Sequence, residues 1–188
     1  REASAAAVAA DMLAQAEHDP QALSVLVTTD DDLARRVPAE LERQLAALSR
    51  QEIARRSLAD RGVILVAADL AEAIDLANAI AIEHLELMIA DPWSQIPHIR
   101  HAGAIFLGHY TPEAAGDYLA GPNHVLPTMG TARYASALGV DTFLKKSSLI
   151  SYSRTALARD ADHIRRLAGL EGLTAHAASV TVRLGDGK

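Results

Sequence analysis

The stretch VILVAADLAEAIDLANAIAIEHLELMIA (residues 63–90) decides the fold, because two short apolar runs flank one helical segment. The runs VILVA (63–67) and LELMIA (85–90) are almost uniformly apolar, which is typical of strands buried on both faces of a sheet. Between them, DLAEAIDLANAIA (69–81) predicts a helix. A strand–helix–strand unit of this kind predicts two parallel strands joined by a right-handed crossover.

The same alternation extends in both directions from this unit. LSVLVTT (23–29) and AIFLG (104–108) predict two further strands. The intervening segments predict helices over 3–18, over 30–58 and, as a short helix, over DPWSQIPHI (91–99). Three aspartates open the second of these, and Pro38 is expected either to start another helix there or to kink one. The chain is therefore predicted to be an α/β protein, with a Rossmann-like parallel sheet covered by helices on both faces.

The chain changes character after Gly108. Residues 109–146 are rich in glycine, proline, threonine and asparagine, with a helix start predicted at Thr111-Pro112-Glu113, where the threonine hydroxyl is expected to cap. The tail reads as a short strand SLISYS (147–152) and a helix over 154–170. We expect two parts: an α/β domain over 1–146, and a helical C-terminal tail over 147–188 that docks on a partner subunit.

Composition limits the classes of function. Of 188 residues, 49% are hydrophobic and 22% charged, which is ordinary for a globular protein, and the net charge of −6 argues against binding to nucleic acid. No apolar run reaches the length of a membrane span, and the chain has no cysteine, which favours a cytoplasmic location. The chain begins at an arginine inside a predicted helix, so we expect a piece of a longer polypeptide.

The polar residues have two interpretations each. Glu83 and His84, at the corner before a strand, are either solvated loop residues or an acid–base pair. Gln15 and His18 share a helical face, where such residues are commonly just solvated. Asp117, Asn123 and His124 follow in a glycine-punctuated segment, where a capping or turn role is the simpler interpretation, and Glu171 and His176 flank a turn in the tail.

Taken together, a glutamine, two histidines and an aspartate can form a nitrogen- and oxygen-ligated metal site that suits zinc, manganese or cobalt. In an open α/β sheet we expect such residues to meet beyond the carboxyl ends of the strands. No G-x-G-x-x-G and no P-loop is present, so the predicted architecture by itself indicates no nucleotide site.

Longer blocks of the sequence resemble one known family. AGAIFLGHYTPEAAGDYLAGPNHVLPTMGTARYASALGVDTFLKKSSLISYS (102–153) closely resembles the corresponding block of histidinol dehydrogenases. AADMLAQAEHDP, IEHLEL and EGLTAHAASVTVRL occur in the same order and at compatible spacing. The resemblance covers essentially the whole chain, as the C-terminal portion of a longer enzyme.

The resemblance implies a specific reaction. The family oxidises L-histidinol to L-histidine through the aldehyde with two NAD⁺, in the last steps of histidine biosynthesis. It binds one zinc per active site and works as a homodimer with an exchanged C-terminal tail. By resemblance, the zinc ligands are Gln15, His18, Asp117 and His176, the last supplied to the neighbouring subunit. Glu83 and His84 are the catalytic pair, and the substrate contacts, beyond the metal ligands and His84, are His124 and Glu171.

One departure and two alternatives accompany this resemblance. Ile82 stands where the family is expected to have proline, which would fix the approach to Glu83 and His84. The residues that contact NAD are expected upstream of Arg1. The chain is therefore either the C-terminal portion of a working enzyme, or a non-catalytic metal-binding and dimerising fragment. A third interpretation is an unrelated α/β protein, in which Gln15, His18 and Asp117 lie far apart.

Overall fold

A computed structural model describes residues 3–185 and divides the chain into two compact units. The first unit extends to Phe143 and the second begins at Leu144. The first unit contains, in order, α1 (Ala5–Ala16), β1 (Ser24–Thr28), α2 (Asp31–Leu45), α3 (Gln51–Arg61), β2 (Gly62–Val66), α4 (Leu70–Ile80), β3 (His84–Leu87), the 3₁₀ helix η1 (Trp93–His98), β4 (Ala104–Leu107), α5 (Glu113–Tyr118) and the 3₁₀ helices η2 (Thr131–Arg133) and η3 (Val140–Phe143).

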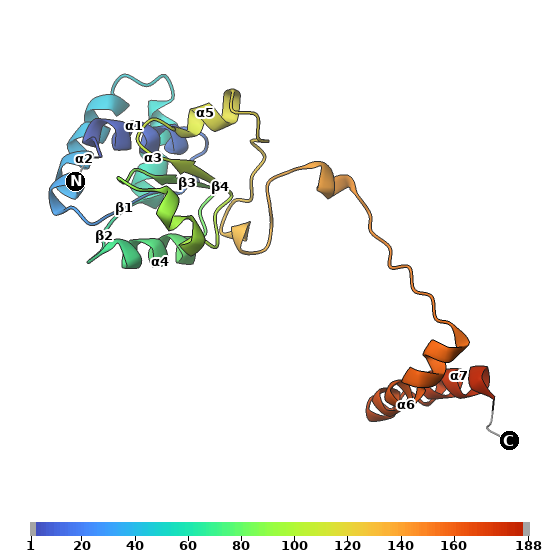
Figure 1. The fold of residues 1–188 in the computed structure, drawn as a ribbon. Helices are drawn as coiled ribbons and strands as arrows, with labels where there is room; N and C mark the ends of the chain where they lie inside the picture. Colours follow the sequence, from blue (N-terminus) through green and yellow to red (C-terminus); the bar gives the residue numbers. More distant parts are fainter. Residues whose placement is uncertain (1–2, 186–188) are drawn as a thin grey trace. The chain divides into compact units, whose positions relative to one another are not determined.

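All strand pairs are parallel, which confirms the predicted α/β class. β1 pairs with β2 from Ser24↔Gly62 to Thr28↔Val66, and β3 pairs with β4 from His84↔Ala104 to Leu87↔Leu107. The ladders form two separate two-stranded sheets among the described residues, where one continuous sheet was expected. Helices α1 and α2 lie on one side of the strands and α4 lies on the other (Figure 1), so helices cover both faces.

The core lies between α1, α2 and the strands. Val8, Met12, Leu33 and Val37 are buried there, and Leu26, among other partly buried residues, packs against them. Burying side chains of this size contributes roughly 1.5–3 kcal/mol each. This packing holds α1 against β1, and it thereby determines where the last turn of α1 lies.

Pro38 does not start a second helix within segment 30–58, which was one of its two predicted roles. Pro38 lies inside α2, which begins after the Asp30 cap, and the chain leaves the helix only after Leu45. Proline removes one backbone hydrogen bond, and the buried face of α2, with Val37 fully buried beside the proline, keeps the helix intact. α3 then begins at Gln51.

The second unit is a pair of packed helices, α6 (Arg154–Leu170) and α7 (Thr174–Leu184). Ala161, Ala168 and Val180 are buried within it. The predicted strand over 147–152 is wrong, because this segment has no regular secondary structure. Residues 147–152 are of types that favour strands, but the described chain offers no neighbouring strand with which they pair. No helix within residues 3–185 has the length and apolar character that crossing a membrane requires.

Candidate functional site

Gln15 and His18 lie at the end of α1, where the chain turns back toward β1. Gln15 is in the last turn, and His18 follows Glu17, which caps the helix. The Gln15 side chain reaches two residues that are distant in sequence: its Nε2 donates to Glu83 Oε2 at 3.4 Å, and its Oε1 lies 2.9 Å from His84 Nδ1. Gln15 therefore contacts both residues of the predicted acid–base pair.

The Glu83–His84 corner is held by backbone geometry. Asp69 caps the start of α4 and Ala81 follows its last residue; Ala81 is buried and adopts the left-handed conformation at φ 56°. The chain then enters β3 through Glu83, whose carbonyl accepts from the Ala104 N–H at 2.9 Å. A Cβ on Gly103 would lie 2.5 Å from the same carbonyl oxygen, so only glycine permits this approach.

Helix α5 contributes two carboxylates on one face. Glu113 opens the helix and Asp117 lies four residues later, which is the spacing at which helical side chains are neighbours. Thr111 does not cap this helix, contrary to the prediction. Its hydroxyl donates to the Leu107 carbonyl at 2.8 Å, and Pro112 occupies the cap position.

His84 has one nitrogen engaged and one available. Because the Gln15 amide nitrogen donates to Glu83, the amide oxygen faces His84, and His84 Nδ1 must therefore be the donor. In the neutral ring this leaves Nε2 without a proton. Nε2 is buried without a hydrogen-bond partner among the described residues, and it lies 3.8 Å from Asp117 Oδ1. A buried imidazole in this state can accept a proton.

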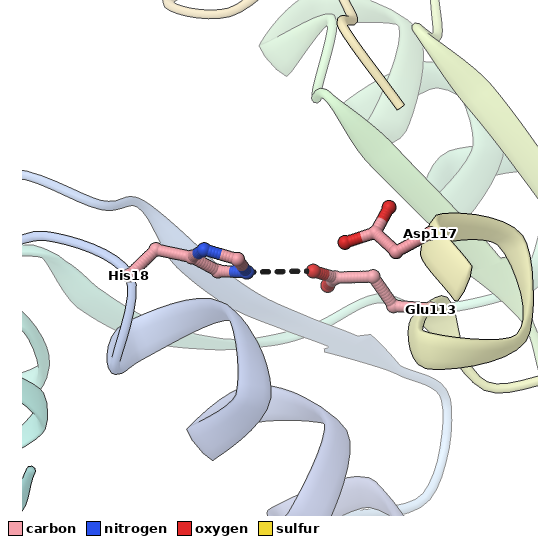
Figure 2. A group of neighbouring side chains, drawn as sticks. All are labelled: His18, Glu113 and Asp117. Carbon is pink, nitrogen blue, oxygen red and sulfur yellow. Dashed lines mark hydrogen bonds and ion pairs between the residues drawn. The ribbon is translucent and has the colours of Figure 1, made fainter. Parts of the chain in front are cut away.

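Three side chains converge beside this imidazole (Figure 2). His18 Nε2 lies 3.2 Å from Glu113 Oε1, and ligand atoms of His18, Glu113 and Asp117 all lie within 4.8 Å of one another. Glu113 Oε2 also lies 3.6 Å from His84 Nδ1. Burial raises the pKa of Glu113, while the charges of His84 and His18 lower it and that of Asp117 raises it. Two carboxylates and imidazole nitrogen form a donor set that suits a divalent metal such as zinc.

A second pair of acids lies next to this group. Glu86 is two residues after His84 on β3, so the two side chains share a face, and Glu86 Oε1 accepts from the Glu113 backbone N–H at 2.9 Å. Burial and the nearby Asp11 carboxylate raise the pKa of Glu86 to about 8. Burial likewise raises the pKa of Asp11, with which Glu86 shares a hydrogen bond. The pair therefore binds a proton near neutral pH.

The residues meet at the amino ends of the strands, and the expectation of the carboxyl ends is wrong. His84 is the first residue of β3, and a short loop over residues 17–23 leads from the end of α1 to the start of β1. A helix that precedes a parallel strand runs antiparallel to it, so the C-terminal turn of α1 has to lie near that strand's amino end.

Within the first unit, one predicted site residue, His124, is not joined to this group, and two others belong to the second unit. His124 is exposed, and no hydrogen bond or ion pair connects it to the group anywhere in residues 3–185. Asn123 takes the predicted turn role, since its Oδ1 accepts from the Val125 N–H at 2.8 Å. Glu171 and His176 are exposed residues of the second unit, at the end of α6 and the start of α7.

Glu113 and Glu86 were missed by reasoning from sequence. Glu113 was interpreted only as part of a helix start, although it and Asp117 are four apart in one short helix. Glu86 is a charged residue within an apolar strand, and it is half-buried. A carboxylate inside a buried strand is the signal that could have identified it.

Comparison with known proteins gives one consistent family. The model of the family described as "Histidinol dehydrogenase" matches residues 1–184. The histidinol dehydrogenase of Desulfotalea psychrophila is 77% identical over 177 residues, covering 94% of this chain and 41% of that protein. That of Syntrophotalea carbinolica is 61% identical over 179 residues, covering 95% and 42%.

A solved structure shows the same fold. The crystal structure of histidinol dehydrogenase from Elizabethkingia anophelis superposes with a TM-score of 0.86 at 36% identity, over 97% of this chain and 42% of that one. The chain thus spans about two fifths of the length of the relatives that it matches.

Proposed function

Because the chain belongs to the histidinol dehydrogenase family, we propose that it carries the acid–base and metal-binding portion of an enzyme that oxidises L-histidinol to L-histidine. The reaction proceeds through the aldehyde and reduces two NAD⁺. The observation that carries the proposal is the convergence of side chains from three separate segments. Gln15 and His18, Glu83 and His84, and Asp117 meet in one contact network, in which Glu113 joins both histidines.

In the first oxidation, His84 accepts the proton of the alcohol. The carbinol carbon transfers hydride to NAD⁺, the O–H bond breaks, and the proton moves to His84 Nε2 as the aldehyde forms. The support for this role is that Nε2 is buried, has no hydrogen-bond partner in the described chain and is left unprotonated by the Nδ1 contact to Gln15. A positioned imidazole base contributes roughly 10²–10⁴-fold to a rate.

In the second oxidation, Glu83 deprotonates the water that adds to the aldehyde. As the water adds, His84 returns the proton of the first step to the aldehyde oxygen and is neutral again. The hydrate then loses hydride to a second NAD⁺ and a proton to His84, and the resulting carboxylic acid releases its last proton to solvent as the carboxylate. Gln15 holds both catalytic side chains, because it donates to Glu83 and accepts from His84. These two contacts hold the Glu83 and His84 side chains in different orientations, so that each can perform its own step.

The side chains present fit a resident zinc ion. By the family resemblance, His18, Asp117 and Gln15 would hold it, with His176 supplied by the partner subunit. His18 and Asp117 lie in one group with Glu113, which is close enough to take part. Bound zinc would supply a Lewis acid that holds the imidazole and amino nitrogens of histidinol. The closeness of Glu113 to Asp117 is consistent with a cation here, since burial and the Asp117 charge raise the pKa of Glu113.

The remaining assignments rest on the family. We propose His124 and Glu171 as substrate contacts, and a cytoplasmic homodimer whose C-terminal tails are exchanged. Exposed apolar side chains in the second unit support docking of that unit: Leu149, Ile150, Leu167, Leu170 and Val182 are all more than 60% exposed. No described residue is assigned to NAD.

One observation favours a second candidate for the chain by itself. Because it spans about 42% of its relatives, the isolated chain can be a metal-binding and dimerising fragment that does not turn over. Zinc content and histidinol-dependent NADH formation, measured on this chain and on a full-length family enzyme that carries it, separate the two. We expect zinc in both and NADH only in the longer protein. Absence of zinc and of NADH from the longer protein would exclude the proposal.

A further inference from the structure

The end of α4 is a chain reversal that leads directly to the proposed catalytic pair. Ala81 follows the last residue of the helix in the left-handed conformation at φ 56°, and its N–H donates to the Ala77 carbonyl at 2.9 Å. Two residues later the chain reaches Glu83 and then His84. A left-handed conformation is unfavourable for a residue with a Cβ, and it persists where the surrounding structure holds it. The direction in which the pair leaves α4 therefore depends on contacts from outside the helix.

One such contact ties the last turn of α4 to the chain that enters β4. Asn78 is 6% exposed, and its Nδ2 donates to the His98 carbonyl at 2.9 Å. Its Oδ1 accepts from the N–H groups of Arg100 at 2.7 Å and His101 at 3.3 Å. These bonds use the Asn78 side chain, so the backbone carbonyls at the end of the helix still need donors from elsewhere.

Arg133, at the end of η2, supplies such a donor. Its Nη2 donates to the Ala79 carbonyl in the last turn of α4, and its Nη1 donates to the Gly130 carbonyl at 2.9 Å. Positive charge at a helix C-terminus is favourable, because the carbonyl end of a helix carries partial negative charge. The planar guanidinium bonds both carbonyls at once, a geometry that the point charge of lysine does not reproduce. Arg133 thus links the end of α4 to a turn 54 residues further along the chain.

The turn that carries Arg133 leaves room for this contact. Met129 and Gly130 both adopt left-handed conformations, at φ 52° and 77°. The N–H and the hydroxyl of Thr131 both donate to the Thr128 carbonyl, at 3.0 Å and 2.6 Å. A Cβ on Gly130 would overlap Arg133 Nη1, so the absence of a side chain there admits the guanidinium.

The same segment contacts the corner before β3 from a second direction. Pro127 is buried, and its Cδ lies 3.2 Å from the place that a Cβ on Gly103 would occupy. The Gly103 N–H donates to the Ile82 carbonyl at 3.0 Å, directly before the catalytic pair. Pro127 therefore supports the corner beside Gly103, while Arg133 supports it at the end of α4.

We propose that Arg133 is a positioning residue for Glu83 and His84. By bonding the last turn of α4 it fixes the reversal at Ala81, and the reversal determines how the two side chains enter the site. A displacement of catalytic groups by about 1 Å costs roughly 100-fold in rate, so loss of this contact should slow the chemical step. The kinetic consequence rests on the proposed function, whereas the contact itself does not.

The kinetic test uses a full-length family enzyme that carries this portion. Arg133→Ala should lower kcat by about tenfold or more, with KM for histidinol changed by less than about twofold. Zinc content should stay the same, because the proposed ligands lie on other segments. Arg43→Ala is the matched control, since Arg43 also makes two guanidinium hydrogen bonds, both to Glu40 within α2. This control should keep the parent kcat.

Guanidinium ion distinguishes positioning from general destabilisation. Arg133 is exposed, so free guanidinium at millimolar concentration can reach the place that Arg133→Ala vacates. It should restore kcat severalfold, whereas sodium chloride at equal ionic strength should not. Guanidinium weakens folded structures, so a variant impaired by lost stability would become less active instead. Arg133→Lys keeps the charge without the planar fork and should show a smaller loss of kcat, which supplies the comparison if Arg133→Ala does not fold.

Amide hydrogen exchange, followed by mass spectrometry of the same proteins, tests the contact without activity. In Arg133→Ala, peptides that contain Gly103 and Ala104 should exchange about tenfold faster or more, because these amides donate to the Ile82 and Glu83 carbonyls. Peptides from α2 should not change.

Three results would overturn the proposal: an unchanged kcat with unchanged exchange, a lowered kcat that guanidinium does not restore, or loss of zinc from Arg133→Ala. If the parent enzyme forms no NADH, the proposed function fails. Exchange at Gly103 and Ala104 then decides by itself whether Arg133 holds the corner.

Discussion

Glu113 connects the two histidines of the site. Its Oε1 lies 3.2 Å from His18 and its Oε2 lies 3.6 Å from His84, while its side chain is only 6% exposed. A buried carboxylate between two imidazoles orients both rings. The two histidines nevertheless differ in burial, because His84 is 7% exposed and His18 is 53% exposed. That difference suits the proposed roles of His18 as a solvent-accessible metal ligand and of His84 as an enclosed base.

Substitution of the two histidines should therefore impair the enzyme in different ways. In a full-length family enzyme, His84→Asn should lower kcat by roughly 10²–10⁴-fold and leave zinc content near one per site. His18→Asn should lose the metal, because the ring supplies one of the nitrogen donors. Steady-state NADH formation and zinc analysis by atomic absorption measure both effects. Equal loss of zinc in the two variants would contradict this division of roles.

Glu86 should make stability depend on pH. Its pKa in the folded chain is about 8, against 4.5 ordinarily, so the folded state holds a proton that the unfolded state has lost between these values. Stability should therefore be greatest below about pH 4.5 with respect to this group, and fall as pH rises toward about 8. Thermal unfolding of metal-free protein between about pH 5 and pH 8 measures this slope.

Glu86→Gln removes the titrating group and should flatten the slope. Glu52→Gln, at an exposed position of α3, is the matched control and should retain the slope of the parent chain. If Glu86→Gln and the parent chain show the same change of Tm with pH, Glu86 is not the group whose pKa is raised on folding.

Helix α5 is positioned by a close contact with β4. Gly116 lies against Phe106, where a Cβ would come 2.6 Å from the ring, and the same ring packs on His84 with centroids 5.9 Å apart. Because Glu113 and Asp117 flank Gly116 on this short helix, the spacing between α5 and β4 determines where both carboxylates lie.

Gly116→Ala should therefore disturb the proposed metal site, although Gly116 is not one of its ligands. We expect the free energy of unfolding to fall by about 1–3 kcal/mol and zinc affinity to fall as α5 moves away from His84. Denaturant unfolding and zinc titration measure the two effects. Gly139→Ala is the control, since no atom lies within 4 Å of a Cβ there. Unchanged zinc affinity in Gly116→Ala would show that α5 is not held by this contact.

At the scale of the whole molecule, the tail histidine tests the proposed exchange between subunits. If His176 serves the partner's site, a dimer of one His18→Asn chain and one His176→Asn chain contains one intact site. Random mixing of the two inactive full-length variants should then restore about a quarter of the wild-type sites.

Refolding the two variants together, followed by an assay of NADH formation, makes the measurement. The variants refolded separately and then combined are the control. If the tail acts within its own subunit, every site in the mixture keeps one defect, and no activity returns.

The sequence by itself determined the elements of this protein and the residue types of its site. Apolar runs and helical periodicity are local properties, so β1 to β4, α4 and α6 could be predicted nearly to their ends. Blocks such as GDYLAGPNHVLPT and IEHLEL also indicated the family, which the comparisons confirm.

The tertiary structure alone decided which residues meet and where. His18 and Glu113 are 95 residues apart in the chain, and no local pattern encodes their 3.2 Å contact. Packing of α1 on β1 places the candidate site at the amino ends of the strands, and packing of α5 on β4 places Glu113 within it. The division of the strands into two separate ladders was equally beyond the sequence, because strand order depends on contacts between distant segments, whereas strand identity depends on neighbours in the chain.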